Sequence, residues 1–203
     1  MPPKTYKPSV QTKNNILQKA IELFNENGTA SVSMNALAES LGISAGNLQY
    51  HYKSKEDVIR AILEVMFHEF DVIYLPTEET FTLDTLRQIM RLNFNLRWKY
   101  RFFYRELVAL LRNDKILAKR YREIQEQRVT EQENLIKRLA GAGGVRGDLS
   151  PEELRNVVLI GWVLGNTWLS HIESMGQKIN DAALVQAVEI MAQHYKPYLQ
   201  EIQ

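Results

Sequence analysis

The sequence predicts an all-α fold, and three observations support this prediction. Apolar residues recur at steps of three and four from Lys13 almost to the C-terminus, which is the spacing of one helix face. No segment alternates strictly between apolar and polar residues over the length of a strand. Serine, threonine or asparagine residues precede most of the apolar stretches, where helix N-caps are expected. With 203 residues, 45% of them hydrophobic, the chain has ample material for a packed core.

The N-terminal part predicts an arm and then helices. Residues 1–12 hold three of the six prolines and show no apolar period, so we expect a flexible basic arm. An apolar stripe over residues 13–27 predicts a helix that ends at Gly28. Further along, Ser54 and the acidic residues after it begin a longer helix that ends before Pro76.

Between these two helices, residues 34–52 carry the pattern of a helix-turn-helix. Ser33 and Ser44 are expected N-caps of two short helices. Ala38 is small enough for the helices to cross closely, and Gly42 tolerates the positive φ of a tight turn. Four apolar side chains then face one core: Leu37, Leu41, Ile43 and Leu48. The alternative is a hairpin that only packs.

The remainder predicts five more helices, so the whole chain has about nine. They cover roughly residues 82–100, 101–111, 114–140, 150–176 and 180 onward. The glycine-rich segment 141–149 is a turn, and Ser150 with Pro151 and Glu153 is a strong helix start. We expect three parts: the arm at 1–12, a head with the helix-turn-helix pattern at 13–57, and a larger helical body at 58–203.

The composition of the chain excludes several kinds of site and several classes of protein. The 25 Lys and Arg residues almost balance 24 Asp and Glu, so bulk charge indicates neither nucleic acid nor membrane. The absence of Cys excludes disulfides, thiolate metal sites and cysteine nucleophiles. The N-terminus has no signal-peptide pattern, and the apolar stretch 157–169 is shorter than the about 20 residues of a membrane helix. We expect a cytoplasmic protein without a membrane partner.

The second short helix of the motif shows small or uncharged hydrogen-bonding groups, where an ordinary solvated face more often carries Glu and Lys. Gln49 and Asn47 have the amide chemistry that pairs with adenine in the major groove. Tyr50 and His51 can donate to phosphate oxygens, which fixes register without reading sequence. The alternative, inward packing of an aromatic ring, fits Tyr52 best because it follows Leu48 by four residues.

Residues 13–65 resemble the N-terminal domain of TetR-type transcriptional regulators, through the segments GxxxxSMNALAESLGIS, GNLQYHY and KSKEDV. The resemblance implies a three-helix DNA-binding head, a helical body that dimerises, and a small-molecule inducer. Ala45 departs from the basic or bulky residue of many relatives, which leaves the base preference open. By resemblance, DNA-contacting positions are Ser33, Ser44, Gly46, Asn47, Gln49, Tyr50, His51 and Lys55, with Ala45 beside them.

The body offers one aromatic cluster, formed by Phe94, Trp98, Phe103 and Tyr104. It predicts an apolar pocket for a small apolar or aromatic inducer, and the alternative is plain core packing. We expect the interleaved arginines to be solvated, with the alternative that one of them binds a ligand anion. The remaining histidines lack metal-ligand spacing, so neither a metal nor a cofactor is expected.

Two helical glycines, Gly161 and Gly165, lie four residues apart and let another helix approach closely. We expect them to face a second copy of the chain, within a four-helix interface. The alternative is that they face a helix of the same chain or line the ligand cavity. The other expected interface residues are Trp168, Leu184, Val188 and Met191.

These observations predict a ligand-responsive transcriptional regulator. It would bind a pseudo-palindromic operator in double-stranded DNA as a homodimer, more often as repressor than activator, and a small-molecule inducer would release it. No Ser-His-Asp or paired-carboxylate arrangement is readable, so no enzyme is expected. The alternatives are a helical small-molecule-binding enzyme and an interaction module that does not bind DNA.

Overall fold

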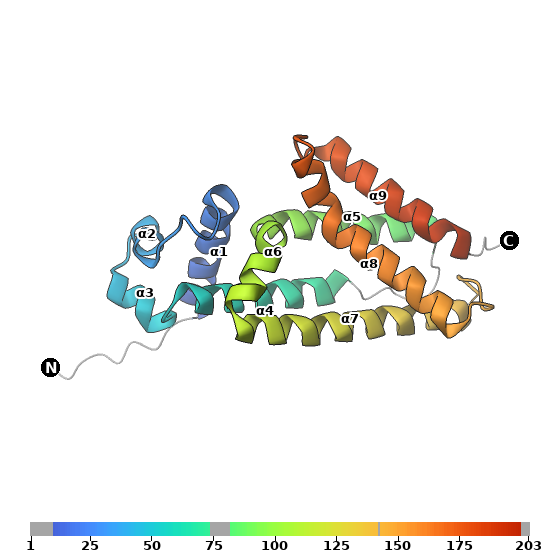
Figure 1. Cartoon of the computed structure of the whole chain (residues 1–203), viewed down its shortest axis with the longest axis horizontal. Coiled ribbons are helices and arrows are strands. Elements are labelled where there is room, and N and C mark those ends of the chain that lie inside the picture. Colours follow the sequence, from blue (N-terminus) through green and yellow to red (C-terminus); the bar gives the residue numbers. More distant parts are fainter. Residues whose placement is uncertain (1–9, 74–81, 142, 200–203) are drawn as a thin grey trace. The chain divides into compact units, whose positions relative to one another are not determined.

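The computed structural model describes residues 10–73, 82–141 and 143–199, which form α-helices joined by short loops (Figure 1). This confirms the all-α prediction. None of the described helices is both long and apolar enough to cross a membrane. The helices are α1 (Val10–Asn27), α2 (Met34–Ser40), α3 (Ala45–His51), α4 (Lys55–Ile73), α5 (Leu83–Lys99), α6 (Arg101–Asn113), α7 (Lys115–Gly141), α8 (Pro151–Ser174) and α9 (Asp181–Tyr195), followed by the 3-10 turn η1 (Lys196–Tyr198).

Helix starts follow the capping residues read from the sequence. The Ser54 hydroxyl accepts from the Asp57 amide at 3.2 Å, and the Asp57 carboxylate accepts from the Ser54 amide at 3.1 Å. At α8, Ser150 and Glu153 form the same reciprocal box behind Pro151. Hydrogen bonds from the Ser150 hydroxyl and amide hold the pKa of Glu153 below its usual range.

The first compact unit, or head, comprises residues up to Phe67 together with residues 100–103. Here α1, α2 and α3 pack on one another, and Leu48 in α3 is completely buried. Residues 100–103 join through Phe102, whose ring lies 5.2 Å from that of Phe24 and whose amide donates to the Asn25 side chain. Residues 10–12 of the expected arm are helical, and residues 1–9 lie outside the described part of the chain.

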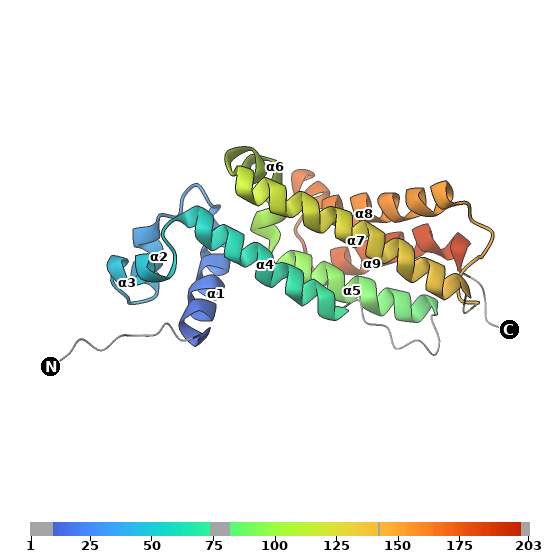
Figure 2. The same ribbon diagram turned by 90° about the horizontal axis from the view of Figure 1, so that it is seen from below.

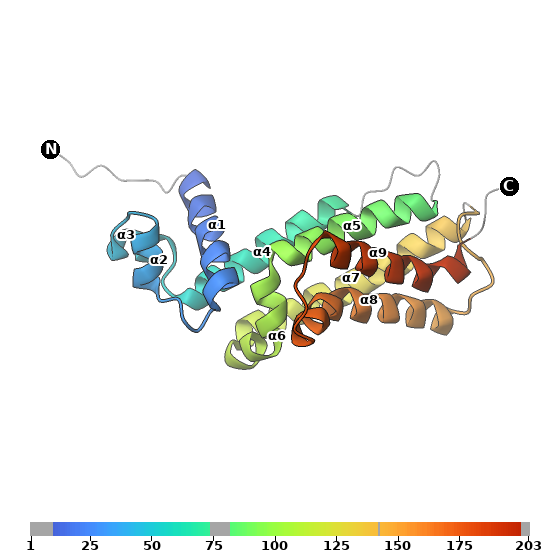
Figure 3. The same cartoon turned by 90° about the horizontal axis from the view of Figure 1, so that it is seen from above.

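The second unit, or body, comprises residues 68–99 and 104 onward. Figure 3 shows α9 lying between α5 and α8, and Figure 2 shows α7 beside α8. Apolar faces of α5, α8 and α9 meet in a buried cluster, because each helix has its apolar residues at three- and four-residue steps. The buried members are Leu86, Met90, Phe94, Leu169, Leu184, Ala187, Val188 and Met191.

The C-terminal turn closes one end of the body. Leu199, just after η1, pairs with Val145 of the α7–α8 loop in an isolated antiparallel bridge. The Arg146 amide donates to the Tyr198 carbonyl at 2.9 Å in the same place. Residues 145–149, in the segment that the sequence predicts only as a turn, therefore supply a wall of the body.

Candidate nucleic-acid interface and ligand pocket

The helix-turn-helix forms as its residues predict. The Ser33 hydroxyl accepts from the Ala36 amide at 3.1 Å, and the Ser44 hydroxyl accepts from the Asn47 amide at 3.2 Å. Both serines are therefore N-caps. Gly42 turns the chain between α2 and α3 with φ of +65°, a conformation in which a Cβ is costly.

The outer face of α3 is free of the head's core. Ala45, Gly46, Asn47, Gln49 and Tyr50 are all exposed. A Cβ built on Gly46 would meet no atom within 4 Å, so packing inside the chain does not require a glycine there. Since Gly weakens a helix relative to Ala, an approaching partner is a physical reason for it. This face carries the amides of Asn47 and Gln49 and the phenol of Tyr50, and at Gly46 the helix backbone can closely approach a partner.

Two of the expected DNA-contacting side chains, His51 and Lys55, lie in surroundings that the sequence did not predict. Both ring nitrogens of His51 are shielded from solvent and have no hydrogen-bond partner among the described residues, because His51 follows buried Leu48 by three residues on the inner side of α3. The Lys55 ammonium donates to the carbonyls of Thr29 and Val32 at 2.5 and 3.1 Å. In this structure Lys55 therefore ties the α1–α2 loop to the start of α4.

Tyr52 is half-buried, in agreement with the inward-packing alternative. Burial raises the pKa of its phenol above the usual value.

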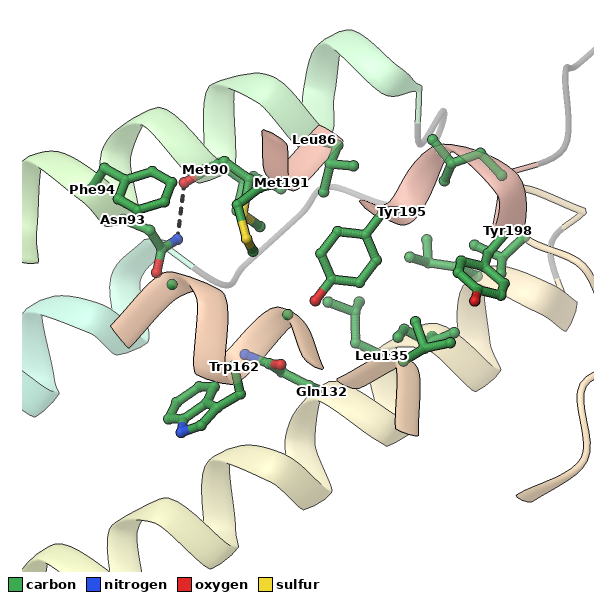
Figure 4. Close-up of a pocket in the computed structure, with 18 of the residues that line it drawn as sticks. Leu86, Met90, Asn93, Phe94, Gln132, Leu135, Trp162, Met191, Tyr195 and Tyr198 are labelled. Atoms are coloured by element: carbon green, nitrogen blue, oxygen red, sulfur yellow. Dashed lines mark hydrogen bonds between the residues drawn. The ribbon is translucent and has the colours of Figure 1, made fainter. Parts of the chain in front are cut away.

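The body contains an apolar pocket enclosed by α5, α7, α8, α9 and the C-terminal turn (Figure 4). Asn93 and Phe94 lie toward one end, Tyr198 and Leu135 toward the other, and Tyr195 points into it. The described lining residues are mostly aliphatic or aromatic: Leu86, Ile89, Met90, Asn93, Phe94, Arg97, Gln132, Leu135, Ile136, Leu139, Val145, Leu149, Val157, Gly161, Trp162, Gly165, Met191, Tyr195, Tyr198 and Leu199.

Of the four aromatic residues expected to form a pocket, Phe94 lines this one. The other three are not among its lining residues. Trp98 packs on the buried cluster and under Arg105, whose guanidinium lies 5.7 Å from its ring. Phe103 is fully buried and belongs to the head, and Tyr104 is not among the lining residues. The helical period breaks at Tyr100, between α5 and α6, so side chains on either side of it do not share a face.

Sequence reasoning missed the polar side chains of the pocket. Asn93 and Arg97 are buried, although we expected the arginines of this region to be solvated. The helical spacing did indicate their burial, because Asn93 and Arg97 follow Leu86 and Met90 at steps of three and four on the apolar face of α5.

The residues expected at a dimer interface are turned into their own chain. A Cβ on Gly161 would lie 2.0 Å from the Tyr195 hydroxyl oxygen, and one on Gly165 would lie 3.3 Å from Arg97 Nη2. Both glycines line the pocket, which is the alternative that the sequence left open. The remaining expected interface residues also pack within the chain, since Leu184, Val188 and Met191 are buried and Trp168 packs against them.

Comparison with known proteins agrees with both units. A family model described as bacterial regulatory proteins of the tetR family matches residues 16–62, and one described as bacterial transcriptional repressor matches residues 70–203. The chain is 48% identical to the regulator UidR of Escherichia coli (strain K12) over 52 residues, 26% of each protein. It is 29% identical to AcrR of Shigella flexneri over 90 residues, 43% of this chain and 42% of AcrR. These alignments span less than half of the relatives' length.

Similarity to solved structures extends over most of the chain. A TetR-family transcriptional regulator from Marinobacter aquaeolei VT8 superposes with a TM-score of 0.81 and 28% identity, covering 93% of this chain and 91% of that one. These relatives are transcriptional regulators and not enzymes. Because one family model spans more than half of the chain and a second covers the helix-turn-helix, the chain belongs to the TetR family of DNA-binding transcriptional regulators.

Proposed function

We propose that this regulator represses transcription by binding a pseudo-palindromic operator with α3 in the major groove, and that a small molecule in the body pocket releases it. The observation that supports this best is the outer face of α3. Gln49 and Asn47 present amides suited to base edges, and Gly46 leaves room for close approach. In this arrangement the groove-facing amides contact base edges, whereas the serine N-caps and the Tyr50 phenol contact phosphates.

We propose a homodimer, because one head reads only half of a palindrome and two-fold symmetry presents two. A second copy fits the exposed apolar side of α8, where Leu159, Ile160 and Val163 are 37%, 52% and 59% exposed. Val185 on α9, which packs against α8, is also 48% exposed. Half-sites about 34 Å apart, or a multiple of that, would match such a dimer.

The pocket supports an inducer. It is largely apolar with a few convergent polar groups, as ligand sites are. A ligand changes DNA affinity only through different affinities for the DNA-bound and free states of the body, so its binding and DNA binding must be reciprocally linked. We place this activity in the cytoplasm, where operator DNA is accessible.

The experiment is fluorescence anisotropy of a duplex from upstream of the chain's own gene, over a series of salt concentrations. We expect tight binding that weakens steeply with salt, since phosphate contacts release counterions. Gly46→Ala should weaken binding at least about tenfold, while circular dichroism shows an intact helix content. Gly147→Ala is the matched control, because a Cβ there also meets nothing within 4 Å but the residue lies in the loop before α8. Wild-type affinity in Gly46→Ala would contradict the proposed approach of α3 to DNA.

A further inference from the structure

Arg97 differs from the other described lining residues of the pocket in its charge. It is only 7% exposed, and it is the one charged side chain among the described residues that line the cavity. Its guanidinium donates to the Asn93 side-chain oxygen at 3.3 Å and, through two nitrogens, to the Asn166 side-chain oxygen at 3.4 Å. These are long hydrogen bonds to neutral groups, so they compensate a buried cation weakly.

No carboxylate of the described residues pairs with Arg97. Arg128, the other buried arginine among the described residues of the body and 6% exposed, shows the contrast. It pairs with Asp71 and, at 2.9 Å, with Glu131. Burying a charge is costly unless an opposite charge and good hydrogen bonds compensate it. Arg128 has that compensation among the described residues, and Arg97 does not.

Aromatic rings surround the Arg97 guanidinium without neutralising it. Phe70, Phe94 and Tyr104 have their ring centres 5.3, 6.0 and 6.0 Å from its central carbon. Cation–π contacts of this kind stabilise the cation but bring no negative charge. Burial raises the pKa of Tyr121 far above its usual value, although Arg97 opposes the shift, so this phenol is neutral at physiological pH. The net positive charge at this end of the pocket persists.

The helix on the other side leaves the guanidinium open to the cavity. Gly165 faces it, and a Cβ there would lie only 3.3 Å from Nη2 and 3.5 Å from the central carbon. The rest of the lining toward Tyr198 carries no charge among its described residues. The Arg97 guanidinium thus lies at one end of the cavity, and the lining away from it is mostly apolar.

We propose that the ligand of this pocket is an apolar carboxylic acid whose carboxylate binds the Arg97 guanidinium. The apolar body of the ligand lies along the aliphatic and aromatic lining toward Tyr198. The planar fork of arginine matches a carboxylate in two hydrogen bonds. A phosphate dianion fits less well, because the described lining offers no second cation. This assignment of ligand class rests on the proposed function and concerns the same pocket.

The test compares ligands that differ only in the charge of the head group. Calorimetry with the full chain measures binding of decanoate against decanol, and of 4-phenylbutyrate against 4-phenylbutanol. We expect at least one acid to bind about tenfold or more tightly than its alcohol, the factor of one charge-assisted hydrogen bond. Arg97→Gln should abolish that preference. Arg91→Gln, on the same helix but in an exposed pair with Asp181, should keep it.

The outcomes separate this proposal from the proposed function. Acids that bind no more tightly than their alcohols, or no binding of any probe, would overturn the carboxylate assignment, and so would a preference that survives Arg97→Gln. The wild-type comparison needs no variant, so a misfolded Arg97→Gln leaves the test intact. Binding of the operator duplex, measured in the same preparations, reports on the proposed function by itself.

Discussion

The two glycines of α8 give a graded prediction for the packing of the body. Gly161→Ala places a Cβ 2.0 Å from the Tyr195 hydroxyl oxygen and 2.7 Å from the ring carbon that bears it. Gly165→Ala places one 3.3 Å from the end of the flexible Arg97 side chain. The first contact requires the Tyr195 ring to move, whereas the second requires a shift of a few tenths of an ångström.

The magnitude follows from comparing the two variants. Each exchange gains up to about 1 kcal/mol of helix propensity, because both glycines lie inside the same helix. The gain in helix propensity is the same for both variants, so the difference between their stabilities reports the cost of the clash. Overpacking a tight site costs about 1–3 kcal/mol, so Gly161→Ala should be less stable than Gly165→Ala by about that amount.

Urea unfolding followed by tryptophan fluorescence is the assay, since Trp98, Trp162 and Trp168 all lie in the body. Tyr195→Leu removes the obstructing hydroxyl and ring, so it should destabilise the Gly161→Ala background less than the wild type. Equal stability of the Gly161→Ala and Gly165→Ala variants would refute the placement of Tyr195 against α8.

Other predictions concern the surface of the body. Ile160→Glu with Val163→Glu should convert a dimer into monomers in sedimentation, while Val108→Glu, on α6 and 69% exposed, should not; a dimer that persists would place the interface elsewhere. Ser150→Ala should raise the pKa of Glu153 toward its usual value in an NMR titration, and an unchanged pKa would contradict the assigned cause. Because folding lowers that pKa, the stabilisation is present at neutral pH and is lost as the pH falls through the folded-state value.

The helices were predictable because their signals are local. Ser33, Ser44 and Ser150 each cap the helix that follows, and the apolar period defines the buried side of each helix without knowledge of its neighbours. The exposed face of α3 follows in the same way, since Leu48 alone fixes which side is buried.

The pocket was less predictable because it depends on which helices meet. The spacing of Gly161 and Gly165 shows that they share a face, but only the packing of α5 and α9 shows that Arg97 and Tyr195 cover it. Arginine is usually solvated, so its burial became clear only from the tertiary structure. The shielding of the His51 ring was hard to predict for a related reason, because the elements that pack beside the last turn of a short helix decide whether its side chains are exposed.

The central claim is that α3 reads base edges, and single-base substitutions across the operator test it most directly. Anisotropy is measured on each substituted duplex for the wild type, Gln49→Ala and Tyr50→Phe. We predict that Gln49→Ala loses its preference at one position per half-site, a loss of about 1–3 kcal/mol there, and keeps the others. Tyr50→Phe should weaken all duplexes to a similar extent, because a phosphate contact carries no sequence information. A Gln49→Ala variant that weakens equally on every duplex, or that keeps every preference of the wild type, would contradict this account.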